Sequence, residues 1–156
     1  MSPTLTFLGC TLWSALKPED TKVLSWVLTD FHRIGNFNPD AYVALHQGDL
    51  AWLNATVTEI QSTEPERVIV VLTHHAPSVT GTGDPKFKGW LTSSAFATEL
   101  TGEAVWTSGN VKVWAFGHTH WGCDFERNGV RVYSNQRGRG EGRDDFDPTK
   151  TVMVSG

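Results

Sequence analysis

The sequence predicts an α/β fold in which a mixed β-sheet ends in a β-hairpin, and three observations predict it. Two apolar runs, residues 67–72 and 111–115, are typical of strands buried in a sheet. Residues 49–61 precede the first run with apolar side chains at helical spacing, and a helix followed by a strand forms an α/β unit. Asn128-Gly129 separates two alternating segments, which is the strongest short signal for a hairpin.

The composition is that of one globular domain, because 39% of the 156 residues are hydrophobic and 19% are charged. A net charge of −4 argues against a nucleic-acid surface, and no apolar run approaches the length of a membrane span. The amino terminus shows no basic region followed by an apolar segment, and Cys10 and Cys123 are too few for a disulfide framework. These features predict a cytoplasmic protein with no nucleic-acid or membrane partner.

The expected strands share an apolar or alternating pattern that is bounded by polar or turn residues. They are residues 5–12, 67–72 and 111–115, the two arms of the hairpin within 123–133, and a terminal strand at 149–154. The strands at 67–72 and 111–115 are each followed at once by two histidines.

The expected helices and loops fill the intervals between these strands. Residues 17–34 show partly helical spacing that the stretch 35–39 interrupts, and residues 93–100 predict a short helix. The helix at 49–61 is predicted to begin with Asp49 as its N-cap. Loops or turns are predicted at 78–89, at 102–110 and in the Gly-rich, flexible stretch 137–145.

Four of the six histidines lie directly after two apolar strands. His74 and His75 follow the first strand, and His118 and His120 follow the second after Gly117, a residue that permits a sharp exit from a strand. In an extended backbone His118 and His120 would face the same side. Ligands gather at the carboxyl ends of strands in open α/β sheets, so these imidazoles predict a transition-metal site. A lone His-x-His pair is otherwise read as two polar loop residues.

The histidine loops resemble those of a known family. Thr73-His74-His75-Ala76-Pro77 followed by Gly117-His118-Thr119-His120 resembles the C-terminal half of the calcineurin-like metallophosphoesterases, closest to a small cytosolic branch common in fungi. Other segments resemble that branch in the same order: Gly9-Cys10-Thr11-Leu12-Trp13, Asp49-Leu50-Ala51-Trp52-Leu53, Gly81-Thr82-Gly83-Asp84-Pro85, Ala95-Phe96-Ala97-Thr98-Glu99-Leu100 and Ser134-Asn135-Gln136-Arg137-Gly138. The resemblance thus covers nearly the whole chain.

The resemblance implies a fold, an activity and a set of site residues. The fold would be the C-terminal half of a four-layer α-β-β-α sandwich, so that residues 1–156 form a single but partial domain. The activity would be hydrolysis of a phosphomonoester or phosphodiester small-molecule substrate by a metal-activated hydroxide. His74 and His118 would bind one divalent ion and His120 a second, with Mn, Fe or Zn as the metals. His75 would contact substrate and replace the family's residue that protonates the leaving group, or it would pack and hydrogen-bond behind the ligands, which is the preferred interpretation.

The chain also departs from the family pattern. The family uses an Asp-x-His, a Gly-Asp after a buried strand and a Gly-Asn-His loop, and this sequence has neither the first nor the last. Its Gly-Asp pairs, Gly48-Asp49 and Gly83-Asp84, follow no buried strand. Three hypotheses follow: a metallophosphoesterase represented by a partial chain that is weak or inactive alone, a non-catalytic binding or regulatory remnant, and a half-enzyme completed in trans.

The remaining candidate residues have structural interpretations beside functional ones. His32 and His46 are read as solvated or structural residues, although the resemblance places their region over the site. The loop at 78–89 forms either a wall of the substrate pocket or a solvated connector. Lys86 and Lys88 in that loop would offer positive charge to a phosphate in the first case and face solvent in the second. The oligomeric state is left open.

Overall fold

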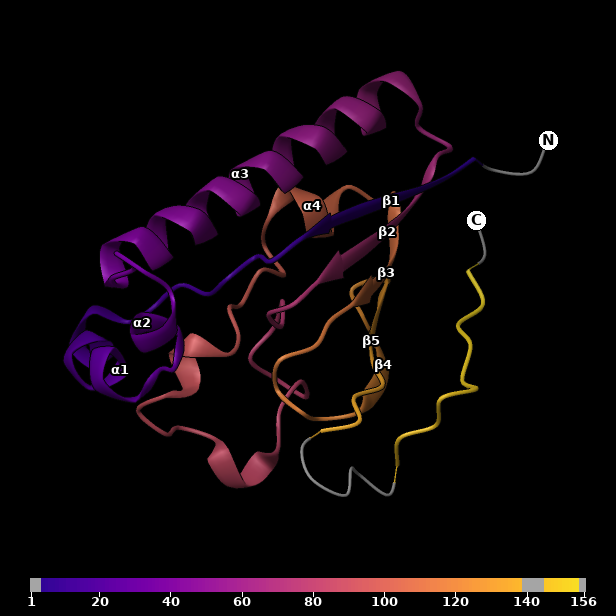
Figure 1. Cartoon of the computed structure of the whole chain (residues 1–156). Coiled ribbons are helices and arrows are strands. Elements are labelled where there is room, and N and C mark those ends of the chain that lie inside the picture. Colours follow the sequence, from indigo (N-terminus) through magenta and orange to yellow (C-terminus); the bar gives the residue numbers. More distant parts are fainter. Residues whose placement is uncertain (1–3, 139–144, 155–156) are drawn as a thin grey trace.

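The sheet is mixed, as the sequence predicts, and it has five strands among the described residues. The computed structural model describes residues 4–138 and 145–154. Its strands lie in the order β1-β2-β3-β5-β4, and all neighbours are parallel except the antiparallel pair β4–β5 (Figure 1). The strands are β1 (Leu5–Cys10), β2 (Val68–Thr73), β3 (Val111–Ala115), β4 (Cys123–Arg127) and β5 (Val130–Ser134).

The long helix α3 (Pro39–Thr63) covers one face of this sheet. Leu53 and Val57 of the helix are fully buried in one apolar cluster with Ile69, Val71 and other strand residues. The burial of this helical stripe against alternating strand side chains stabilises the fold by removing apolar area from water. The opposite face keeps large apolar side chains in solvent; among them are Leu5, Phe7 and Leu72. The described residues contain one sheet with a helical cover on one face, and the four-layer sandwich stays a prediction.

The start of α3 corrects a sequence prediction. The helix begins ten residues before Asp49, after Asn38, whose side chain accepts a hydrogen bond from the Ala41 amide at 2.8 Å. Asp49 lies in the middle of the helix, because Gly48 continues the helical backbone instead of ending it. The prediction that Asp49 is an N-cap is therefore wrong.

Two short helices lie beside the first turns of α3. They are α1 (Thr21–Val27), preceded by the 3-10 turn η1 (Pro18–Asp20), and α2 (Asp30–Arg33). Leu24 of α1 is buried in a second apolar cluster, and Phe31 of α2 packs against it. The buried members of this cluster are Leu16, Leu24, Leu28, Tyr42 and Ala95. This cluster holds α1 and α2 near the carboxyl ends of the first strands (Figure 1).

The hairpin is confirmed in detail. Asn128 and Gly129 have φ angles of 50° and 79°, and Arg127 pairs with Val130 across the turn. A turn with two positive φ angles follows the right-handed twist of the strands, and Asn-Gly adopts it with little strain.

Other boundaries differ from the sequence predictions. Residues 93–100 form only the 3-10 turn η3 (Ser93–Ala95), because Ala97 then pairs with Ala76 in an extended bridge. Residues 149–154 form no strand, and Met153 is 84% exposed. Most of the predicted flexible stretch 137–145 lies outside the described residues. The 102–110 turn includes the short helix α4 (Ala104–Thr107), and the 78–89 loop includes the 3-10 turn η2 (Pro85–Phe87).

No helix in the described part of the chain has the length and apolar character needed to span a membrane.

Candidate metal centre

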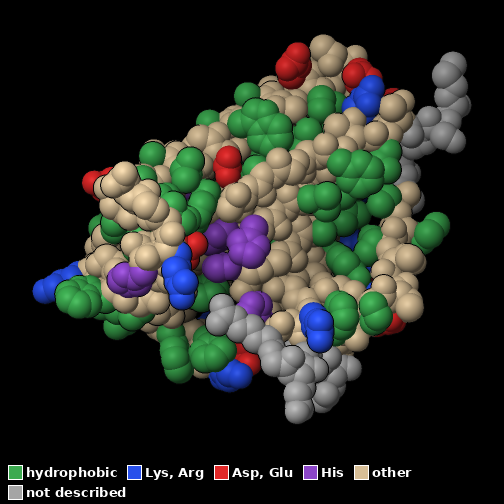
Figure 2. All heavy atoms as spheres, in the orientation of Figure 1, with side chains coloured by type: hydrophobic (Ala, Val, Ile, Leu, Met, Phe, Trp, Pro, Cys, Tyr) green, Lys and Arg blue, Asp and Glu red, His purple; other side chains and the backbone are tan. Residues whose placement is uncertain are grey.

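Two histidine loops meet at the carboxyl ends of β2 and β3. The amide of Gly117 donates to the carbonyl of His74 at 3.0 Å, which joins the two loops through their backbones. One ligand nitrogen from each of His74, His75 and His118 lies within 4.8 Å of the others. Figure 2 shows histidine side chains gathered in a patch at the surface. We call these three residues the histidine cluster.

The backbone at His118 and His120 corrects the expected geometry of the second loop. Both residues have positive φ, 67° and 52°, whereas Gly117 is absent from the residues with positive φ. The chain therefore turns at the histidines and not at the glycine, and the two-residue alternation of an extended strand does not apply. His120 lies outside the histidine cluster, and its amide donates to Oε1 of Gln136 at 2.7 Å. Its assignment to a second metal stays a prediction.

His75 is the buried member of the cluster, with 3% of its surface exposed. Its Nδ1 lies 2.9 Å from Oγ of Ser14, and its ring contacts those of Trp13 and Tyr42. Burial and the neighbouring histidines lower the pKa of His75 to about 2, against a smaller opposite effect of a hydrogen bond with the Ala95 backbone. These contacts favour a packing and hydrogen-bonding role for His75 over direct contact with substrate.

His118 and His74 form the accessible side of the cluster. The ring of Phe96 stacks on His118 at 4.6 Å, and the two imidazole centroids are 4.7 Å apart. Burial lowers the pKa of His118 to about 4 and also lowers that of His74. Both imidazoles are therefore neutral at neutral pH, which is the form that binds a metal ion. The negative charge of Asp30 acts in the opposite sense on both pKa values.

A strained turn after β1 positions Trp13 and Ser14, which both contact His75. Leu12 and Trp13 have φ angles of 69° and 47°, a conformation that costs free energy in residues with side chains. Two residues of α3 hold this turn: Asp49 accepts from the Leu12 amide, and Nδ1 of His46 lies 2.8 Å from the Leu12 carbonyl. The buried His46 thus has the structural role that the sequence predicts.

We expect Asp49→Ala to lower the free energy of unfolding by about 1–3 kcal/mol. The substitution leaves the amide of the fully buried Leu12 without its 2.8 Å acceptor, and an unsatisfied buried donor costs free energy of this order. Urea denaturation measures the change. Glu59→Ala on the exposed side of α3 is the matched control, with an expected change within about 0.5 kcal/mol. Equal stability of the two variants would show that α3 does not hold the turn.

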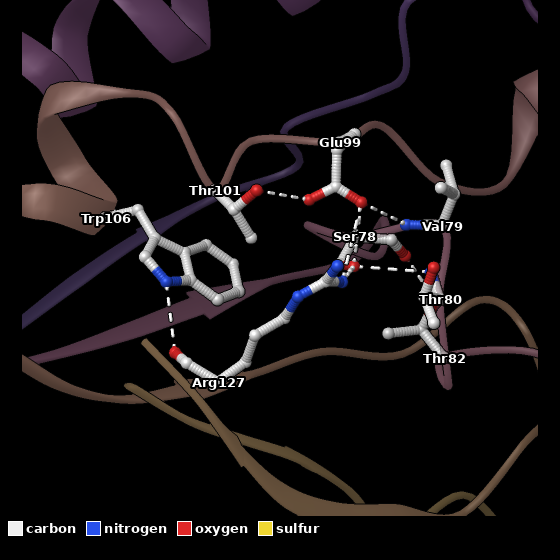
Figure 3. A network of polar contacts seen from close by, with 8 residues as sticks. All are labelled: Ser78, Val79, Thr80, Thr82, Glu99, Thr101, Trp106 and Arg127. Atoms are coloured by element: carbon white, nitrogen blue, oxygen red, sulfur yellow. Dashed lines mark hydrogen bonds and ion pairs between the residues drawn. The ribbon is translucent and has the colours of Figure 1, made fainter. Parts of the chain in front are cut away.

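The loop that follows the first histidines is tied to the hairpin by a polar network (Figure 3). Glu99 accepts from Oγ of Ser78 at 3.1 Å and lies 3.5 Å from the guanidinium of Arg127 on β4. Arg127 also donates to Ser78, and its carbonyl accepts from the indole of Trp106 at 3.2 Å. This part of the 78–89 loop is therefore anchored and is not a free connector. Lys86, farther along the loop, pairs with Asp84, and its predicted contact with phosphate stays untested.

The cluster has the chemistry of a transition-metal site. Imidazole nitrogens bind several divalent metals, among them Zn, Fe and Mn. A neutral imidazole can bind a metal ion without first releasing a proton. Two nitrogens on one zinc ion at about 2.1 Å lie roughly 3.4 Å apart, so side-chain rotations of modest size would bring together atoms that now lie within 4.8 Å. The residues therefore fit one divalent metal ion.

Comparisons with known proteins find one similar sequence, and that protein is uncharacterized. No protein-family model and no solved structure matches the chain. The chain is 28% identical over 159 residues to the uncharacterized protein L509 of Acanthamoeba polyphaga mimivirus. The match covers 96% of this chain and 56% of the viral protein, so the chain spans little more than half the length of that relative. The viral protein brings no function to the comparison.

Sequence reasoning missed the residues that surround the histidines. These are Ser14 and Tyr42, together with Asp30, whose charge acts on the cluster from α2. The segments of Ala95 and Gln136 belong to the resemblance, but neither residue was given a role at the site. Each comes from a segment that only the tertiary fold brings to the loops. The helical spacing at 17–34 gave a signal for the α2 region, but nothing in it singled out one carboxylate.

Proposed function

We propose that this chain carries the histidine loops of a metal-dependent phosphoesterase, an enzyme that hydrolyses a phosphomonoester or phosphodiester. The observation that carries the proposal is the convergence of three neutral imidazoles from two loops at the carboxyl ends of adjacent parallel strands. The resemblance of the same two loops to those of the calcineurin-like metallophosphoesterases supports the reaction class. The proposal includes the activity of the whole enzyme and the second metal ion expected at His120.

The chain's own residues would have distinct tasks at such a site. His74 and His118 would hold a divalent ion, Mn, Fe or Zn, while His75 packs behind them through its bond to Ser14. Outer residues that fix an imidazole in this way orient the ligands and tune their basicity. When bound, the metal ion would lower the pKa of a water molecule and neutralise negative charge on the phosphoryl oxygens. Phe96 would fix the plane of His118 by stacking on it.

A non-catalytic metal-binding module is the second candidate. The histidine cluster contains no carboxylate, and the two-metal chemistry of the complete family needs one to bridge its ions. The sequence also lacks the Asp-x-His and Gly-Asn-His motifs that supply the family's other ligands. A chain that binds one metal and hydrolyses no phosphate ester would fit this candidate, and activity that appears only with a second polypeptide would fit a half-enzyme completed in trans.

Metal counting tests the proposal directly. We expect the chain loaded with Zn or Mn and then desalted to retain at least one ion, measured by mass spectrometry of the metal. His118→Ala should weaken binding by about 10-fold or more because it removes a ligand. His32→Ala is the matched control, since this exposed histidine bonds to the Trp26 carbonyl and lies outside the cluster.

Hydrolysis assays then separate the candidates. Turnover of a chromogenic phosphodiester or phosphomonoester by the loaded chain, lost in His118→Ala and kept in His32→Ala, is the result expected for a phosphoesterase. Retained metal without turnover favours the binding module. A wild-type chain that holds no metal ion would contradict both functions.

A further inference from the structure

Two residues of the second histidine loop have strained backbone conformations. His118 and His120 have φ angles of 67° and 52°, in the left-handed region that residues with side chains rarely adopt. The amide of Thr119 donates to the carbonyl of Gly117 at 2.8 Å, so His118 is the central residue of a γ-turn with positive φ. This kind of γ-turn is rare and strained. Such conformations persist only where the surrounding structure fixes them.

The side chain of Gln136, two residues after the end of β5, contacts three consecutive residues of this loop. Its Oε1 accepts a hydrogen bond from the amide of His120 at 2.7 Å. Its Nε2 lies within hydrogen-bond distance of Oγ1 of Thr119, at 3.1 Å, and of the carbonyl oxygen of Trp121, at 3.2 Å. One side-chain amide thus holds His120 and both of its neighbours in the chain.

The surroundings determine which way the Gln136 amide faces. A backbone N–H group only donates and a backbone carbonyl only accepts, so Oε1 must face the amide of His120 and Nε2 the carbonyl of Trp121. A reversed amide would bring two donors together at His120 and two acceptors together at Trp121. A carboxylate or an apolar side chain of the same length would leave at least one of these backbone groups without its partner. The loop therefore requires a primary amide at this position.

The Gln136 amide is in turn fixed to the sheet. Its Nε2 lies 2.6 Å from Oγ of Ser134, a buried residue at the end of β5 whose hydroxyl donates to the Phe116 carbonyl at 2.9 Å. The strand β5 lies beside β3, which leads into the histidine loop (Figure 1). The side chain of Asn135, between Ser134 and Gln136, instead exchanges two hydrogen bonds with the backbone of Asp147. The two adjacent amides thus hold different segments of the chain.

The other end of the loop is held by the first histidine loop. The amide of Gly117 donates to the carbonyl of His74 at 3.0 Å, and the ring of His118 lies 4.1 Å from that of His75. His118 therefore lies between the first loop on one side and the residues held by Gln136 on the other. Without the bonds to Gln136, the strained residues could relax to negative φ. A change of φ at His118 would move its imidazole relative to the other two.

We propose that Gln136 is a positioning residue of the metal centre, whose side-chain amide holds the strained loop so that His118 and His120 are in place before a divalent ion binds. The inference rests on the proposed metal centre. Gln136 is not a ligand in this assignment, because its amide oxygen and nitrogen are engaged with the loop and with Ser134. Loss of a residue that orients a metal ligand typically lowers metal affinity about 10- to 100-fold.

Cobalt binding tests this assignment with a readout that needs no activity. The probe is Co²⁺ alone, titrated into the full chain, with the affinity and the visible d–d spectrum recorded together. Gln136→Met keeps the length of the side chain but removes its donor and its acceptor. This variant is expected to lower the Co²⁺ affinity about 10- to 100-fold and to change the d–d bands, because the imidazoles are no longer held in the same geometry.

Asn135→Leu is the matched control, because it replaces the adjacent amide, which bonds to the backbone of Asp147. Its Co²⁺ affinity should change less than about 3-fold, since it orients no ligand, and its spectrum should be that of the wild type. Gln136→Asn keeps the amide but is one methylene group shorter, and it should lower the affinity about 3- to 10-fold. Circular dichroism verifies that each variant is folded, and Gln136→Asn replaces Gln136→Met in the test if the latter does not fold.

The outcomes separate the positioning role from the metal centre itself. A folded Gln136→Met with the affinity and spectrum of Asn135→Leu would overturn the role of Gln136, while loss of binding in His118→Ala would still support the metal centre. A wild-type chain with no Co²⁺ affinity would overturn both.

Discussion

Acidification from pH 6.5 to pH 5 is expected to lower the free energy of unfolding of the metal-free chain by about 3 kcal/mol. His75 and His118 have pKa values of about 2 and about 4 in the folded protein because they are buried, against 6.5 for an ordinary histidine. The unfolded chain therefore binds more protons than the folded one in this window, and stability falls as the pH falls. Each group contributes up to about 1.4 kcal/mol per pH unit below 6.5.

Urea denaturation at pH 7, 6.5, 6, 5.5 and 5 measures this dependence above the range in which most carboxylates titrate. His118→Asn removes one of the two groups and should reduce the slope by about half. His32→Asn is the control, because it removes an exposed histidine outside the cluster and should leave the slope unchanged. A wild-type stability that is flat between pH 6.5 and 5 would show that the imidazoles are not buried as neutral rings.

The elements with a local signal were predicted well. The β2 and β3 strands follow from continuous apolar runs, and the hairpin follows from Asn128-Gly129, whose positive φ angles the structure confirms. Each of these signals lies within a few consecutive residues. The terminal strand at 149–154 failed because an alternating pattern does not provide a neighbouring strand, and strands are stable only when paired.

The errors share a physical cause, which is contact between residues far apart in the chain. Asp49 looks like an N-cap beside Gly48, but its side chain bonds to Leu12, 37 residues earlier, and the helix passes through Gly48. The backbone of the second histidine loop has positive φ at His118 and His120 and not at Gly117. Gln136 bonds to Thr119 and His120 of this loop, and Gly117 bonds to the first loop. Local propensity contains no information on either constraint.

The candidate site divides in the same way. Position after two parallel strands predicted that His74, His75, His118 and His120 gather at one edge of the sheet, and the first three of these lie together in the histidine cluster. It was not sufficient to predict the partners of these residues. Ser14 lies 61 residues from His75 in the sequence, and Phe31, next to Asp30, packs against Tyr42, whose ring contacts that of His75. Long-range packing, which a single sequence does not encode locally, selects these residues.

Trp114→Ala is expected to lower the free energy of unfolding by about 3–5 kcal/mol, the range for removing a buried aromatic side chain from a core. The ring of Trp114 is fully buried in β3 and lies 5.5 Å from that of Trp106. Trp26→Ala is the control, because the Trp26 ring is 76% exposed and its removal should cost less than about 0.5 kcal/mol. Urea denaturation gives both values.

The same tryptophan also connects the core to the histidine loop, and a second variant separates the two roles. Its indole Nε1 donates to Oγ1 of Thr73 at 3.0 Å, and this hydroxyl donates to the His75 carbonyl at 2.7 Å. Trp114→Phe keeps most of the buried ring but removes the indole donor, so we expect a loss of about 1–2 kcal/mol. A Phe variant as unstable as the Ala variant would mean that the bond to Thr73, and not the packing of the ring, keeps the loop in place. A loss below about 1.5 kcal/mol in Trp114→Ala would contradict its place in the core.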